Sequence, residues 1–118
     1  MIRRLITLPK WEKVRIMRVI ARGSLQRFWG RPGCGDARGP LHSWYEEAAK
    51  AQWRSPQDIK RRYPHASICG NNRVVFNVGG SKYRLVVEVQ YRAGIVWIKL
   101  VGTHEEYDRI DVETMNAC

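Results

Sequence analysis

Residues 73–101 read RVVFNVGGSKYRLVVEVQYRAGIVWIKLV, and this stretch decides the fold. Apolar and polar residues alternate along most of it with a period of two, as in β-strands that bury one face. The residues at 79–80 and 92–94 interrupt the pattern, and both interruptions are short enough for hairpins. The stretch therefore predicts a three-stranded antiparallel meander, with strands at 73–78, 83–91 and 95–101.

The alternation also assigns the strand residues to two faces of the sheet. One face is apolar, and we expect it to pack against N-terminal helices: Val74, Phe76, Val78, Leu85, Val87, Val89, Val96, Ile98 and Leu100. The other face gathers cations and one indole ring: Arg73, Asn77, Lys82, Arg84, Trp97 and Lys99. Antiparallel sheets often leave one face in water, but cations pair with phosphates and an indole stacks on an unpaired base. The concentration of cations favours a binding face over an ordinary solvated one.

Helical signals precede the strands. Residues 17–22 read as a short strand, and Ser24 is a candidate N-cap for a helix over 25–29. The glycine- and proline-rich residues 30–40 predict a loop. A helix over 41–53 follows, with Leu41, Trp44, Tyr45 and Ala48 on one face, and Ser55-Pro56 starts another short helix. Helices followed by consecutive strands predict an α+β fold rather than repeated βαβ units.

Residues 103–108, THEEYD, directly follow the third strand. Thr103 and Glu106 match the capping box, which predicts a short helix here. His104 and Tyr107 then lie one turn apart on the same helix face, beside Lys99. This pair could handle protons around a bound phosphate. The alternative is that Tyr107 packs the last turn and His104 only caps it.

The charge of the chain points to a polyanionic partner. Its 118 residues are 44% apolar, which suits one compact domain, and they carry a net charge of +10. Such an excess favours nucleic acid, an acidic membrane surface or an acidic protein over a merely basic soluble protein. No apolar stretch approaches the roughly 20 residues that cross a bilayer, so we expect a cytoplasmic protein without a membrane partner.

The cysteines, the histidines and the N-terminal residues 1–16 give little information about function. The chain has three cysteines but no CxxC pair, and its histidines lack ligand spacing, so neither a metal nor another cofactor is expected. Residues 1–16 carry a net charge of +4, by five basic residues against one acidic. We expect Met17 to be the functional start of a single domain over 17–118, with 1–16 as an upstream extension. The alternative is that 1–16 form a basic tail that helps to bind a polyanion.

Two motifs in one order and spacing resemble the HigB toxin family. RVVFNVGGSKYRLVVEVQY at 73–91 is similar to its FN-x-GG-x-x-(Y/L)-R pattern, and VGTHEEYD at 101–108 is similar to its THxEYD pattern. The segments upstream fit as well, so the resemblance covers Met17 to about Val112. The sequence departs from the family at Ser81, where asparagine is common, and in the loop 30–40.

The resemblance implies a RelE-like fold, with N-terminal helices packed on a small twisted antiparallel sheet. It also implies the toxin of a bacterial type II toxin–antitoxin pair. Such toxins are similar to metal-independent endoribonucleases that cut mRNA, usually on the ribosome, and thereby inhibit translation. The implied partners are mRNA, the ribosome and a HigA-like helix-turn-helix antitoxin, whose complex with the toxin binds operator DNA.

Metal-free RNA cleavage requires three catalytic roles, and the sequence offers a candidate residue for each. A base must take the proton of the 2′-hydroxyl, cations must stabilise the pentavalent phosphate, and an acid must protonate the 5′-oxygen. We expect Arg84 to hold the phosphate, aided by Lys99, with His104 as general base and Tyr107 as general acid or phosphate-positioning group. The roles of His104 and Tyr107 are exchangeable at this stage. The expected RNA contacts are Arg73, Asn77, Lys82, Arg92 and Trp97.

Two other functions remain open from the sequence. The same cationic face would serve a non-catalytic RNA- or ribosome-binding protein. A ParE-like toxin with this fold would instead act on a DNA topoisomerase. The pair His104 and Tyr107 beside a cationic sheet favours the nuclease over the topoisomerase-directed toxin.

Overall fold

The structure is a computed structural model that describes residues 17–113, and side chains up to residue 109. The expected extension at 1–16 lies outside the described residues. Five strands form one sheet in the order β1-β5-β4-β3-β2. Their bounds are β1 Arg18–Ile20, β2 Ser67–Ile68, β3 Arg73–Val78, β4 Tyr83–Gln90 and β5 Ile95–Thr103.

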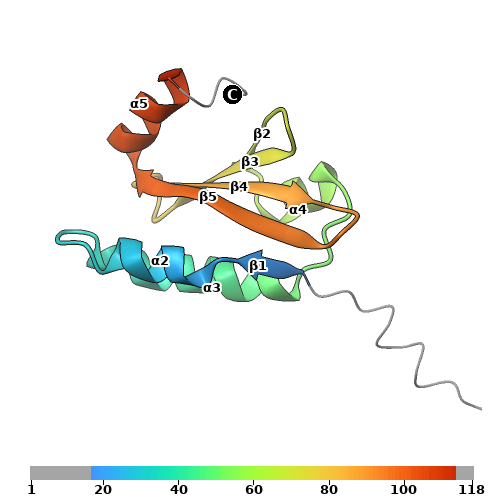
Figure 1. Ribbon diagram of the computed structural model, residues 1–118, viewed down its shortest axis with the longest axis horizontal. Coiled ribbons are helices and arrows are strands. Elements are labelled where there is room, and N and C mark those ends of the chain that lie inside the picture. The colour runs from blue at the N-terminus through green and yellow to red at the C-terminus, as the bar shows by residue number, and fades with distance from the viewer. Residues whose placement is uncertain (1–16, 114–118) are drawn as a thin grey trace, which may run out of the picture.

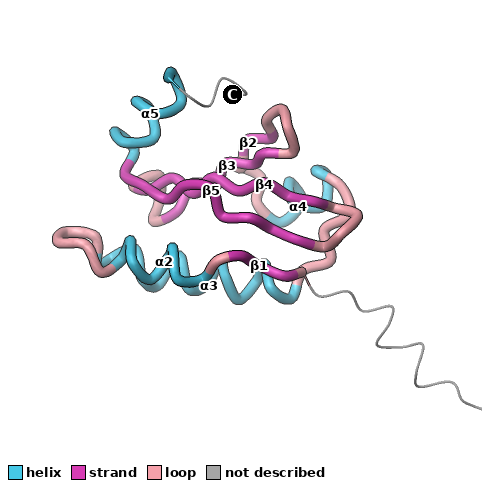
Figure 2. Tube along the Cα trace, in the orientation of Figure 1, coloured by secondary structure: helices cyan, strands magenta, loops and turns pink. Residues whose placement is uncertain are grey.

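The predicted meander forms the centre of this sheet. β3 pairs with β4 and β4 with β5, both antiparallel, as the two short interruptions in the sequence require. β1 adds a parallel edge beside β5, and β2 adds an antiparallel edge beside β3. Figure 2 shows these strands in magenta, with the helices in cyan around them.

The helices lie on both sides of the sheet. They are α2 Arg22–Trp29, α3 Arg38–Lys50, α4 Pro56–Arg62 and α5 His104–Glu113, with a short 3₁₀ helix, η1, at Gly35–Ala37. In Figure 1, α2 and α3 lie together on one side, and α5 stands on the other side at the end of β5. This arrangement confirms the predicted α+β class. We call the face covered by α2 and α3 the core face, and the other the open face.

Two details of the helix prediction are wrong. α2 begins at Arg22 with Ala21 as its N-cap, so Ser24 is a helical residue and not the cap. The expected loop at 30–40 contains η1 and the first turn of α3, which begins at Arg38. Pro40 fits in that turn because the first backbone N–H groups of a helix have no intrahelical partner. The loop prediction is therefore confirmed for residues 30–34 and wrong for residues 35–40, which are helical.

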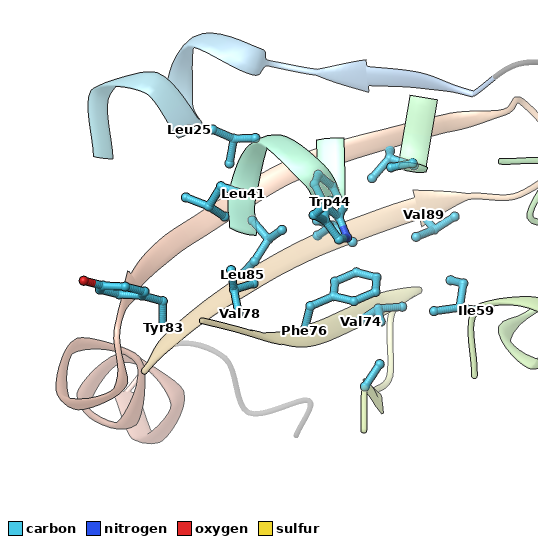
Figure 3. Packing of buried hydrophobic residues seen from close by; sticks show 14 of the residues in the cluster. Leu25, Leu41, Trp44, Ile59, Val74, Phe76, Val78, Tyr83, Leu85 and Val89 are labelled. Atoms are coloured by element: carbon cyan, nitrogen blue, oxygen red, sulfur yellow. The ribbon is translucent and has the colours of Figure 1, made fainter. Parts of the chain in front are cut away.

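The core face is filled by aromatic and branched side chains. Phe76 is 1% exposed, and its ring lies 5.4 Å from that of Trp44 and 5.0 Å from that of Tyr63, measured between centroids. Figure 3 shows Leu41 and Trp44 of α3 facing Phe76 and Leu85 of the sheet. The period-two prediction is confirmed for every core-face residue of β3 and β4, which are 0–6% exposed.

A β-bulge changes the faces of β5 after its midpoint. Val87 pairs with Ile98 but Val86 pairs with Leu100, so Lys99 is an extra residue in β5. Leu100 therefore packs with Val86 on the open face, and Val101 packs against the core. The predicted face of Leu100 is wrong, because a strict alternation does not allow for an inserted residue.

Candidate active site

A small apolar cluster supports α5 on the open face. Val75 and Val86 are buried at its centre, with 4% and 0% of their surfaces exposed. Leu100 and Tyr107 pack against them, both partly buried. The ring of Tyr107 is thus held by packing, as one of the two sequence interpretations expected, and this packing fixes its position at the edge of α5.

Arg84 lies next to that ring. The guanidinium carbon of Arg84 is 5.9 Å from the centroid of Tyr107, within the range of a cation–π contact. Its Nη1 donates hydrogen bonds to the carbonyl oxygens of Ser81, at 2.8 Å, and Tyr83, at 3.4 Å. Among the described residues no hydrogen bond of Nη2 or Nε of Arg84 is formed, so those donors can take an anion. The structure therefore brings Arg84 and Tyr107 together on the open face.

The turn before β4 aims the carbonyl that holds Arg84. Gly79, Gly80 and Ser81 have φ angles of 64°, 61° and 79°, all in the left-handed region. Two glycines adopt this region without a side-chain clash, whereas Ser81 adopts it at some cost. The glycine pair in the motif thus has a structural reason beyond closing a hairpin, since it directs the Ser81 carbonyl to Arg84.

The first turn of α5 is clamped by Glu106. The predicted capping box is confirmed: Thr103 N–H donates to Glu106 Oε1 at 2.9 Å, and Glu106 N–H donates to Thr103 Oγ1 at 3.1 Å. Arg31, which follows α2, donates to the same carboxylate from its two terminal nitrogens: Nη2 to Oε2 at 2.9 Å and Nη1 to Oε1 at 3.3 Å. The Arg31 hydrogen bond, together with the Thr103 N–H, lowers the pKa of Glu106 below its ordinary value.

Gly102 makes room for this clamp. It lies opposite Arg84 on the open face, and a Cβ added there would meet Glu106 Oε1 at 3.1 Å and Glu106 Cβ at 3.3 Å. A side chain at Gly102 would therefore crowd the Glu106 side chain, which would have to move by a few tenths of an ångström. The missing side chain also leaves space beside Arg84.

His104 begins α5 and is exposed. Its Nδ1 lies 3.5 Å from Asp108 Oδ2, one turn further along the helix, and its backbone N–H donates to the Lys82 carbonyl at 3.2 Å. His104 shares the helix side of Tyr107, as their three-residue spacing predicts. The sequence analysis did not predict that Asp108 lies next to the imidazole ring of His104.

The remaining open-face candidates lie further along the sheet. Lys99 is exposed in the bulge, and its Nζ is 3.7 Å from Glu88 Oε1. Glu88 is in register with Arg73 on one side and Trp97 on the other, and Trp97 is 38% exposed. This row is separated from Arg84 by the apolar cluster. The open face therefore has Arg84 beside the acidic first turn of α5 and one carboxylate, Glu88, further along the sheet.

Two predicted RNA contacts lie elsewhere. Lys82 was expected on the open face, but its Nζ lies 2.5 Å from Asp36 Oδ2, and Asp36 also accepts a hydrogen bond from Tyr83 on the core face. The Asp36 carboxylate raises the pKa of Lys82.

Arg92 lies in the turn after β4, at the opposite end from Arg84, roughly 26 Å away along the strand. The structure does not bring either residue to Arg84. Asn77, in contrast, pairs in register with Arg84 and is exposed.

Sequence reasoning missed Arg31 and Gly102 as residues that position α5. The capping box revealed one half of the clamp, but Arg31 is 75 residues away from Glu106 in the chain. No periodic pattern joins such distant positions. Gly102 follows an apolar run and carries a signal only once the strand register is known.

Neither a metal cluster nor a spanning helix occurs in the described part of the chain. No group of three or more histidine, cysteine or acidic side chains is placed to hold a metal ion within it. No helix in the same residues has the length and hydropathy to cross a membrane.

Comparison with known proteins gives the class of this fold and site. The family model for the HigB toxin, described as the RelE-like toxic component of a toxin–antitoxin system, matches residues 37–110, more than half of the chain. The chain therefore belongs to this family of RelE-like toxins. The resemblance seen in the motifs and the expected RelE-like fold are confirmed.

Individual relatives carry more specific names. The chain is 34% identical over 62 residues to a protein of Escherichia coli named mRNA interferase toxin HigB, and equally to one of Shigella flexneri named mRNA interferase HigB. The match covers 51% of this chain and 60% of each relative. The chain thus spans less than two thirds of these relatives.

Proposed function

We propose that the protein is a metal-independent endoribonuclease that cuts mRNA through the 2′-hydroxyl of the nucleotide before the cut. The relatives named mRNA interferases support the substrate. The observation that carries the proposal is the placement of Arg84 against Tyr107 on a partly exposed face of a chain with a net charge of +10. A cation beside a phenol, with a histidine one turn away, provides the groups that this reaction needs.

The proposed reaction transfers two protons and exchanges one bond at phosphorus. The 2′-oxygen attacks the phosphorus as a base removes its proton, and the bond to the 5′-oxygen breaks as an acid protonates that oxygen. The products are a 2′,3′-cyclic phosphate and a 5′-hydroxyl. Water is not consumed in this step.

The residues take roles that their positions support. Arg84 binds the phosphate through the donors that its carbonyl contacts leave available, and it stabilises the extra negative charge of the transition state. Tyr107 lies next to that cation and supplies the phenol that donates to the 5′-oxygen. His104 is the base, with Asp108 orienting its ring. Lys99, further along the face, binds a neighbouring phosphate of the RNA.

The cellular setting follows from the same proposal. The substrate is mRNA on the ribosome, in the cytoplasm, so cleavage stops translation. A HigA-like antitoxin with a helix-turn-helix domain neutralises the toxin, and the complex binds the operator DNA through the antitoxin. We expect Arg84→Ala and Tyr107→Phe to abolish growth arrest but to leave the protein folded and able to bind the antitoxin.

The test is cleavage of mRNA mapped by primer extension after brief induction of the toxin. We expect cuts with the wild type and a loss of about 10²- to 10⁴-fold in cleavage rate with Arg84→Ala. The matched control is Arg38→Ala, which removes the same charge from an exposed position at the start of α3. This control should cut at the wild-type rate.

Other outcomes favour the other functions. Ribosome binding with intact mRNA would indicate a non-catalytic RNA-binding protein. Intact mRNA with induced DNA damage would indicate a topoisomerase-directed toxin. Equal cleavage by Arg84→Ala and Arg38→Ala would remove Arg84 from the proposed site.

A further inference from the structure

A cavity opens at the outer edge of β3, near the turn that holds Arg84. Its volume is about 230 Å³. The lining residues come from the end of α4 and the segment after it, from β3, and from the turn before β4: Arg62, Tyr63, Pro64, His65, Ala66, Phe76, Asn77, Gly80 and Ser81. No carboxylate is among these residues, but the cation of Arg62 is paired with Glu47, which also accepts a hydrogen bond from Tyr63. The cavity therefore suits a neutral group.

The cavity exists because β2 covers only part of the edge of β3. β2 pairs with Val74 and Val75, and the same register would place residue 65 opposite Asn77. The chain instead diverges there, and the cavity lies between the two segments. The edge of β3 is therefore open at Asn77.

The backbone of Asn77 faces this opening. Cys69 N–H donates to the Arg73 carbonyl across the β2 edge, whereas Val89 N–H donates to the Asn72 carbonyl across the β4 edge. Because strand residues alternate between edges, Asn77 points its N–H and C=O in the same direction as Arg73, toward β2. No residue that the structure describes pairs with them across that edge. A donor and an acceptor thus stand side by side at the cavity wall.

The cavity and the phosphate site share one residue, Ser81. The carbonyl of Ser81 holds Arg84 at 2.8 Å, and Ser81 also lines the cavity. Asn77 is the register partner of Arg84, so their Cα atoms are about 5 Å apart. A ligand with a phosphate on Arg84 therefore has the cavity within reach of its adjacent group, which in RNA is a ribose and its base.

The lining suits a base better than a peptide. His65 offers an exposed flat ring, while Tyr63, which packs on Phe76 and lies under the Arg62 guanidinium, forms part of the wall. The peptide group of Asn77 offers the adjacent donor and acceptor that the edge of a base can pair with. A peptide that adds a strand needs a longer row of open backbone groups. Here Val75 is already paired with β2, and the turn begins at Gly79, so only Asn77 is open.

We propose that this cavity, formed by Tyr63, His65 and the edge of β3 at Asn77, holds one unpaired RNA base next to the phosphate bound by Arg84. The cavity selects which nucleotide stands beside the cut. This inference rests on the proposed nuclease function. It adds His65 and Tyr63, which the sequence did not assign, and it gives the predicted contact Asn77 a specific partner.

The test compares base preference in His65→Ala, Asn77→Pro and the wild type, by two readouts. Asn77→Pro removes the backbone N–H at the open edge of β3, where a sheet tolerates proline. The first is the base composition around the cuts on an mRNA carrying a randomised segment, read on ribosomes. The second is the affinity for short single-stranded oligonucleotides that differ in one base. Both side chains are exposed, so both variants should fold, and His42→Ala is the matched control at an exposed histidine on α3.

We expect the wild type and His42→Ala to prefer one base at one position beside the cut by about tenfold or more. His65→Ala and Asn77→Pro should each reduce that preference at least threefold while cleavage continues. Cleavage with an unchanged preference in both variants would overturn the cavity but leave the nuclease proposal intact. The same variants weakening antitoxin binding, with the preference unchanged, would assign the cavity to a peptide and also overturn it.

The oligonucleotide readout separates the two proposals in the other direction. If the wild type does not cut RNA but binds oligonucleotides with a base preference that the variants lose, the cavity is supported and the nuclease proposal fails. If the wild type neither cuts RNA nor distinguishes the bases, both fail.

Discussion

The two faces of the sheet differ in burial and in the kind of side chain they carry. On the core face, all three inward residues of β3 are 0–6% exposed and contact α3 or its neighbours: Val74, Phe76 and Val78. On the open face, the apolar centre consists of Val75 and Val86, and the charged and phenolic groups around it are partly exposed. One face therefore supplies most of the stability, which leaves the other free to hold groups for binding and chemistry.

The contrast also shows how the active-site helix is attached. α3 lies on the core face through a wide apolar contact, whereas α5 is held by a small cluster and one polar clamp, Glu106 with Arg31. A change in the clamp should move α5 without unfolding the sheet. Substitutions on the two faces should thus differ in kind and in size.

The largest expected effect is on the core face. Phe76→Ala removes a ring packed among three aromatic side chains, and we expect it to lower the free energy of unfolding by about 3–5 kcal/mol. Val86→Ala, equally buried on the open face, should cost about 2 kcal/mol because it removes fewer atoms. Urea denaturation of both variants measures the difference. An equal loss of stability would contradict the close packing of Phe76 among its three aromatic neighbours.

On the open face the effect should fall on activity. Tyr107→Phe keeps the ring on Val86 and removes only the hydroxyl, so we expect stability within about 0.5 kcal/mol of wild type and cleavage reduced about 100-fold or more. Tyr107→Ala should lose both. Thermal denaturation and primer extension on the same preparations separate the two effects. A Tyr107→Phe protein with full cleavage would reduce Tyr107 to a packing residue.

Sequence patterns predicted the core face, because burying apolar side chains at every second residue leaves a direct trace. They failed at Lys99, where one inserted residue moves Leu100 to the open face. They also predicted the capping box of Glu106 but not Arg31, since contacts between distant segments depend on the finished fold. Strand alternation predicted Arg84 on the open face, but the helix start was expected to put His104 and Tyr107 beside Lys99. Instead Tyr107 lies against Arg84, and Lys99 lies near Glu88 further along the sheet.

A third prediction tests the clamp through pH. The pKa of Glu106 is lowered in the folded protein by Arg31, so the folded state binds fewer protons than the unfolded state around the ordinary value of 4.5. The stability that Glu106 provides is therefore present above that value and is lost as the pH falls through the lower folded pKa. We expect the wild type to lose more stability than Glu106→Gln between about pH 6 and pH 3.

Thermal denaturation across this range measures the clamp. Asp36 and Glu47 also have lowered pKa values, caused by hydrogen bonds to Lys82 and Tyr63 respectively, and they act equally in both proteins. The difference between the proteins should stay below about 1 kcal/mol because the pair is partly exposed. Identical pH profiles would show that Glu106 does not stabilise α5 as a carboxylate.

The smallest expected effect is in the turn that connects β3 and β4. Ser81 has a φ of 79°, which asparagine tolerates better than serine, so Ser81→Asn should raise the free energy of unfolding by about 0.5 kcal/mol. Ser81→Val should lower it, because a β-branched residue fits this region poorly. Urea denaturation of the pair checks the sign. A stabilised valine variant would mean that the turn does not hold this conformation.

The central claim is that Arg84 and Tyr107 act on one phosphate. The most direct test is a double-mutant cycle of cleavage rates with Arg84→Lys, Tyr107→Phe and the combined variant, on folded proteins that still bind antitoxin. If both groups serve the same step, the combined variant should lose little more than the worse single variant. A combined loss equal to the product of the two single losses would show that they act independently, and it would contradict a shared site.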